Sequence, residues 1–213
     1  MNDLNINENP DRLTDGNFCN KNNPVEVFKV WYADARHSEI NDPNAMTLAT
    51  VDAQGYPNAR IVLMKDMDDS GFTFYTNTLS TKGRELAQLP HAALVFHWKS
   101  LRRQVRVRGI VLPVVAEEAD VYFATRPRIS QIGAWASQQS QELDSRETLE
   151  HAVREQEERF ADAEVRRPPH WNGYLLSPLA IEFWHDRPFR LHDRMVFERT
   201  DATTEWTRRR LYP

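Results

Sequence analysis

This chain of 213 residues lacks the features that mark secreted and membrane proteins. Its single cysteine, Cys19, excludes an intrachain disulfide and is typical of a reducing compartment. No apolar run approaches the ~18 residues needed to cross a bilayer, and the Asn-rich N-terminus lacks the basic start and apolar stretch of a secretory signal. We therefore expect a cytoplasmic protein that does not bind membranes, in which Cys19 is not a nucleophile.

Motifs of the common nucleotide, metal and nucleophile sites are also missing. No GxGxxG, GxxxxGK[ST] or GxSxG pattern occurs, so Rossmann, P-loop and hydrolase-elbow sites are unsupported. The seven histidines are scattered without a His-x-His or HExxH pair, so no metal site is expected. The net charge of −4 argues against a nucleic-acid binder, and a solvated edge strand explains the closing WTRRRLYP better than a nucleic-acid tail does.

What the chain does contain is many short strand patterns with few helices between them. Three strands are expected over residues 45–77, with turns at Gln54-Gly55 and Ser70-Gly71. Further strands are expected over 91–98, 102–115, 173–178, 180–186, 189–200 and 205–213, and helices over 24–39, 80–89, 116–126 and 144–163. The pattern predicts a mainly β protein, an antiparallel barrel with added helices, formed by one domain over residues 24–213 after a flexible arm over residues 1–23.

Two of the expected strands alternate basic and apolar side chains. Alternation over 59–66 places Arg60, Val62 and Met64 on one face and Ile61, Leu63 and Lys65 on the other. In the strand over 102–115, Gln104, Arg106 and Arg108 share a face opposite Val105 and Val107. For the first pattern, a solvated strand terminus is favoured over a binding site. For the second, a half-exposed strand explains the pattern as well as a binding site does.

The stretch YFATRPRISQIGAWASQQSQ, residues 122–141, contains Gly and Pro and collects many hydrogen-bond donors. Its guanidinium, hydroxyl and amide groups are those that a phosphate site needs. A polar loop that satisfies its own backbone explains the stretch equally well. The donors are Tyr122, Arg126, Arg128, Ser130, Gln139 and Ser140.

The segment FRLHDR, residues 189–194, spaces three basic side chains two residues apart. In a strand, Arg190, His192 and Arg194 share one face, while Leu191 and Asp193 share the other. A row of cations repels itself unless an anion or an aromatic ring lies across it. This segment is therefore a candidate binding surface.

Read in order, several blocks resemble the pyridoxamine/pyridoxine 5′-phosphate oxidase family of FMN enzymes. They are ARIVLMK, FYTN, SLRRQVRVRG, RPRISQIGAWASQQS, IEFWHDRPFRLHDR and RRRLYP, and the resemblance covers residues 25–213. SQIGAWAS and RLHDR together are its most specific part. The resemblance implies an FMN-binding split barrel and a homodimer with FMN at the subunit interface.

The resemblance also implies a reaction. Pyridoxamine 5′-phosphate and pyridoxine 5′-phosphate are oxidised to pyridoxal 5′-phosphate, with hydride passing from C4′ to flavin N5 and O2 reoxidising the flavin to give H2O2, in vitamin B6 biosynthesis and salvage. Two alternatives stay open: a related split-barrel flavoprotein that acts on a different ring substrate, and a flavin-binding module without turnover.

Matching positions imply the site residues. FMN contacts are implied for Arg60, Ile61, Val62, Leu63, Met64, Lys65, Tyr75, Thr76, Lys82, Gln104, Gln139, Ser140, Trp184 and Arg194, partly from the second subunit. Substrate contacts are implied for Lys65, Tyr122, Arg126 and Ser130 at the phosphate and for Arg190, Leu191 and His192 at the ring, with Arg190 and His192 as the catalytic pair.

The chain departs from the family pattern at two places. Thr81 stands where the family often has a basic residue, which predicts modestly weaker FMN retention. The N-terminal arm lacks the Arg-rich, Tyr-containing segment that closes over the substrate in some members.

Overall fold

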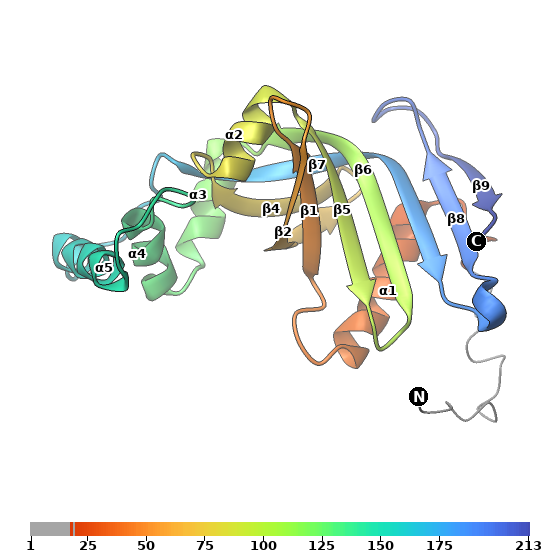
Figure 1. Cartoon of the computed structure of the whole chain (residues 1–213), viewed down its shortest axis with the longest axis horizontal. Coiled ribbons are helices and arrows are strands. Elements are labelled where there is room, and N and C mark those ends of the chain that lie inside the picture. The colour runs from red at the N-terminus through yellow and green to blue at the C-terminus, as the bar shows by residue number, and fades with distance from the viewer. Residues whose placement is uncertain (1–17, 19) are drawn as a thin grey trace.

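The computed structural model describes residue 18 and residues 20–213, and its main element is a nine-stranded sheet. The strands run in the order β2-β1-β5-β6-β7-β4-β3, with β8 paired to β7 and β9 to β8, and every pairing is antiparallel (Figure 1). This confirms the predicted antiparallel architecture. The strands are β1 Ala45–Val51, β2 Pro57–Leu63, β3 Asp66–Asp68, β4 Gly71–Asn77, β5 His91–Trp98, β6 Arg103–Pro113, β7 Trp171–His185, β8 Asp193–Glu198 and β9 Thr207–Leu211.

Helices cover the barrel and extend from one end of it. They are α1 Pro24–Ser38, α2 Thr81–Gln88, α3 Ala116–Ala124, α4 Arg128–Ala136 and α5 Arg146–Phe160, with a short 3₁₀ turn, η3, at Pro188–Arg190. Figure 1 shows α3, α4 and α5 at one end of the molecule and β8, β9 and η3 at the other. None of the helices in the described part of the chain is long and apolar enough to span a membrane.

The core of the barrel is aromatic. Phe28 of α1 is fully buried and its ring lies 4.9 Å from that of Phe72 and 5.0 Å from that of Phe96. Val105 and Val107 of β6 are fully buried, as the alternation of that strand predicts. The predicted helix over 24–39 is confirmed as α1. It begins at Pro24 because the Asn23 side chain caps its N-terminus and proline is favoured in the first turn.

The predicted arm over residues 1–23 lies mostly outside the described residues, as does Cys19. Phe18, however, is buried, and its ring packs 4.9 Å from that of Trp31 on α1. Phe18 therefore belongs to the hydrophobic core although it precedes α1 in the chain.

Several predicted elements have different limits. The three strands expected over 45–77 are four, because the chain leaves β2 after Leu63 and pairs again as β3 and β4. The two strands expected over 173–178 and 180–186 are one, β7, with a bulge opposite Arg108 and Gly109. A Cβ on Gly109 would lie 2.0 Å from the Ser177 carbonyl oxygen, so this close approach requires glycine.

The stretch over residues 122–141, for which a phosphate site and a polar loop were equally good interpretations, contains a helix, α4. Pro127 takes the N-cap position of α4, where a missing N–H is harmless. Ile132 of α4 packs with Phe123, Val165 and Trp171 in a second, smaller core. This small core fixes α3 and α4 beside the barrel.

The strand predicted over 189–200 is wrong at its start. Phe189 and Arg190 adopt φ values of 59° and 64°, in the left-handed region, and β8 begins only at Asp193. Arg190, His192 and Arg194 therefore do not share one strand face. Pro188, which cannot donate to a sheet ladder, favours the turn over continued pairing.

Candidate active site

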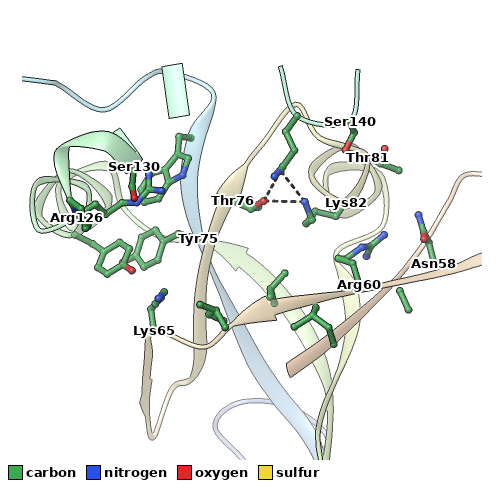
Figure 2. A pocket seen from close by; sticks show the side chains of 18 of the residues that line it. Asn58, Arg60, Lys65, Tyr75, Thr76, Thr81, Lys82, Arg126, Ser130 and Ser140 are labelled. Carbon is green, nitrogen blue, oxygen red and sulfur yellow. Dashed lines mark hydrogen bonds between the residues drawn. The ribbon is translucent and has the colours of Figure 1, made fainter. Parts of the chain in front are cut away.

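A cavity of about 810 Å³ lies between β2, β4, α2 and the α3–α4 segment (Figure 2). Residues far apart in the sequence meet here because β4 pairs with β7 and α2 follows β4 directly. The predicted site residues that line it are Arg60, Ile61, Val62, Leu63, Lys65, Tyr75, Thr76, Lys82, Tyr122, Arg126, Ser130, Gln139 and Ser140. Thr81, singled out as a departure from the family pattern, also lines it, whereas sequence reasoning missed Asn58, Ala59, Thr125, Pro127 and Trp171.

Met64 is the one residue of the predicted run over 60–65 that does not line this cavity. Its side chain is 5% exposed and belongs to the barrel core. Both backbone groups already have partners, since its N–H donates to the Asn44 carbonyl and its carbonyl accepts from the Asn44 amide, each at 2.9 Å. In a single copy of the chain, Met64 is therefore a residue of the barrel core.

The remaining predicted residues form a second group around the start of β8. Gln104, Trp184 and Arg194 stand side by side across β6, β7 and β8, because Gln104 pairs with Trp184 and Trp184 with Arg194. The ring of His192 lies 4.6 Å from that of Trp184. The second group is Gln104, Trp184, Arg190, Leu191, His192 and Arg194, and none of these lines the cavity described above.

The two groups lie at different ends of the molecule. Figure 1 shows η3 and the start of β8 far from α3 and α4, which form one wall of the cavity. One copy of the chain therefore does not bring all the predicted residues together.

A buried lysine lies at one end of the cavity. Lys82 is 9% exposed, and its Nζ donates to Thr76 Oγ1 at 3.2 Å, Ser80 Oγ at 3.2 Å and Gln139 Oε1 at 3.0 Å. Figure 2 shows Thr76 and Lys82 above Arg60. Burial lowers the pKa of Lys82, and the charge of Arg60 lowers it further. Two cations held this close indicate a site for an anion.

A stack of aromatic rings lines the other end. The Tyr75 ring lies 4.1 Å from that of Tyr122 and 5.2 Å from that of Trp171, with nearly parallel planes. Burial and the neighbouring Glu118 raise the pKa of Tyr75 to about 12, so its hydroxyl stays protonated. The stack gives the cavity a flat apolar wall.

A second cationic cluster lies beside this stack. The guanidinium of Arg126 lies 4.9 Å above the Trp171 ring, and burial lowers the pKa of Arg126. Its Nη1 is buried without a hydrogen-bond partner, which is costly unless a ligand accepts from it. Figure 2 shows Arg126, Ser130 and Lys65 on one side, Arg60 and Lys82 on the other, and Tyr75 and Thr76 between them. The cavity therefore has two separate places for anionic groups.

Models of known families match most of the chain. Residues 33–160 match the family described as pyridoxamine 5′-phosphate oxidase. The chain belongs to the pyridoxamine 5′-phosphate oxidase family. Residues 171–213 match the pyridoxine 5′-phosphate oxidase C-terminal dimerisation region, which contains most of the second group.

Individual relatives of this family cover the full chain. A pyridoxine/pyridoxamine 5′-phosphate oxidase of Azorhizobium caulinodans is 62% identical over 206 residues, which are 97% of this chain and 96% of the relative. One of Rhodopseudomonas palustris is 56% identical over 213 residues, the whole of both chains.

Solved structures agree on the fold. PhzG from Burkholderia lata, in complex with tetrahydrophenazine-1-carboxylic acid, superposes with a TM-score of 0.85 at 31% identity, over 91% of this chain and 94% of that one. A pyridoxamine 5′-phosphate oxidase-related, FMN binding protein of Nostoc punctiforme gives 0.70 at 17% identity, over 90% and 98%, which speaks to the fold alone.

Proposed function

We propose that this protein is an FMN-dependent oxidase that converts pyridoxamine 5′-phosphate and pyridoxine 5′-phosphate to pyridoxal 5′-phosphate. The observation that carries the proposal is the cavity with two cationic clusters, Arg60–Lys82 and Lys65–Arg126, flanking an aromatic wall. FMN and the substrate are each a flat ring joined to a phosphate. One cavity with two anion sites can hold such a pair. The chain has a single cysteine, which is typical of a cytoplasmic enzyme.

The residues present fit FMN. The cavity supplies the charged and neutral donors that a phosphate prefers, from Lys82, Arg60 and the hydroxyls of Thr76, Thr81 and Ser140. At Thr81 a hydroxyl stands where the family often has a basic residue. FMN, when bound, supplies the hydride acceptor that no side chain provides, and O2 then returns it to the oxidised form with release of H2O2.

The chain's own residues bind and orient the substrate. Lys65, Arg126 and Ser130, with the Tyr122 hydroxyl, hold its phosphate at the far end of the cavity. Because phosphate binding fixes one end of a rigid ring, it limits the positions that the C4′ end takes up. Arg190 and His192 of the second group contact that ring.

The second group acts on the partner's cavity in a two-fold dimer. Its residues lie mostly in the segment that matches a dimerisation region, and in one copy they lie far from the cavity. A symmetric dimer forms two identical sites, each built from both chains. This arrangement supports FMN at the subunit interface.

We expect the purified protein to be yellow and to consume O2 when pyridoxamine 5′-phosphate is added. An absorption spectrum and an oxygen electrode measure both. A colourless protein that does not bind added FMN would contradict the proposal. A yellow protein that ignores both phosphorylated vitamers but oxidises a reduced tricyclic acid would favour the alternative of a different ring substrate, which the likeness to PhzG motivates.

Replacing Trp171 should weaken substrate phosphate binding. Trp171→Leu removes the ring under the Arg126 guanidinium, so we expect KM for pyridoxamine 5′-phosphate to rise about tenfold with a smaller change in kcat. Trp171→Phe keeps a ring and should raise KM less. Steady-state kinetics test both variants, and equal KM values for the two would contradict a role for the aromatic face.

A further inference from the structure

A buried carboxylate lies unexpectedly close to the proposed cofactor phosphate site. Glu85 of α2 is 6% exposed, and its Oε2 lies 3.2 Å from Nη2 of Arg60. It stands three residues after Lys82, on the same side of the helix. The negative charge of Glu85 repels an anionic ligand. We therefore ask which favourable effect of Glu85 offsets this repulsion.

The contacts of Glu85 connect three elements around one guanidinium. Its carboxylate accepts from Thr50 Oγ1 of β1 at 2.5 Å, from Asn58 Nδ2 of β2 at 3.0 Å and from Arg60. Burial pushes the pKa of the Glu85 carboxyl upward, but the hydrogen bonds from Thr50 and Asn58 and the charge of Arg60 hold it below its usual value. Glu85 is therefore an ionised, fully engaged acceptor.

The donors of Arg60 show what this network achieves. Nη1 donates to the Leu48 carbonyl at 3.3 Å and to Thr50 Oγ1 at 2.5 Å, and Nη2 donates once to Glu85. A guanidinium has five N–H groups, so the N–H of Nε and the second N–H of Nη2 have no partner among these contacts. Thr50 Oγ1 accepts from Nη1 and donates to the same Glu85 oxygen that Nη2 contacts, so Thr50 and Glu85 lie along the Nη1–Nη2 edge. The other edge, formed by Nε and Nη2, is the arrangement that binds two phosphate oxygens at once. Arg60 lines the cavity, next to Lys82 in Figure 2.

We propose that Glu85 is a positioning residue, which holds Arg60 by one edge so that the Nε–Nη2 edge is presented to the FMN phosphate. The proposal rests on the proposed binding of FMN. It assigns Glu85 a favourable effect on anion binding although its charge is negative. If Glu85 only repelled the phosphate, removing its charge would strengthen FMN binding. If Glu85 positions Arg60, removing its charge weakens FMN binding, so the direction of the change distinguishes the two effects.

The test is Glu85→Gln in the apoprotein, titrated with FMN and with riboflavin by quenching of flavin fluorescence. The amide keeps the size of the side chain but turns one acceptor into a donor facing Arg60, Thr50 and Asn58. We expect the FMN Kd to rise about tenfold and the riboflavin Kd to stay unchanged, because riboflavin has no phosphate. A tighter or unchanged FMN Kd overturns the proposal, as does an equal loss for both flavins, which indicates general disruption.

Two further variants complete the experiment. Thr50→Val removes the hydroxyl that bonds both Arg60 and Glu85, and it should lower the FMN-to-riboflavin preference in the same way, which decides the matter if Glu85→Gln does not fold. Glu158→Gln makes the same charge change at an exposed position of α5 and should leave both Kd values unchanged. If the wild-type protein binds riboflavin but not FMN, or neither, the proposed function fails rather than this inference.

Discussion

Combining two inactive variants in one dimer should restore activity. Arg126→Ala damages the cavity and Arg190→Ala damages the second group, so each homodimer should lose most of its turnover. In a heterodimer of the two, one site receives both changes and the other receives neither, so we expect about half of the wild-type activity. Co-expression with two different affinity tags and sequential purification isolates this heterodimer for an oxygen-consumption assay.

The control is a heterodimer of two variants that both alter the cavity. Arg126→Ala and Ser130→Ala both alter the cavity, so every site of their heterodimer carries one change and activity should stay low. Failure of the Arg126/Arg190 pair to recover activity would contradict a site shared between subunits. Recovery by the control pair would contradict the assignment of Arg126 and Ser130 to the same cavity of one chain.

The sequence predicts those helices and strands that depend on residues close together in the chain, such as a helix and its N-cap. The helices expected over 80–89 and 144–163 are confirmed as α2 and α5. Their N-caps are Ser80 and Ser145, and a serine side chain accepts from an N–H three residues ahead regardless of the remaining fold. The turn at Phe189 and Arg190 was not predicted, because it depends on how the chain enters β8 rather than on alternation. Without the resemblance, nothing local would distinguish Arg60 from an ordinary strand terminus.

Tertiary pairing explains the site residues that the sequence did not reveal. Trp171 reaches the cavity because it pairs with Asn77 at the end of β4, nearly a hundred residues earlier in the chain. Glu85 has a local signal, since its spacing from Lys82 places both on one helix face, but a charged helix face is usually solvated. Only the contacts with Thr50 and Asn58 show that this face points inward.

Lys82 should contribute more to FMN affinity than other single residues, and it should make this affinity fall at alkaline pH. Lys82→Met removes a buried cation and its charge-assisted bonds, so we expect the FMN Kd to rise about a hundredfold, with a smaller direct effect on substrate oxidation at saturating FMN. Arg190→Ala should do the reverse. Fluorescence titration gives Kd, and steady-state assays with excess FMN give kcat.

The direction of the pH dependence follows from the lowered pKa of Lys82. An anion binds the protonated amine better, so affinity is complete below that pKa and is lost as pH rises through it. Because burial places the pKa below the ordinary 10.5, the loss begins at a lower pH than a solvent-exposed lysine would give. Lys82→Arg keeps its charge throughout this range and should bind FMN with a flat alkaline profile. A wild-type affinity that stays constant up to pH 10.5, or an equal decline in Lys82→Arg, would show that another group controls the phosphate site.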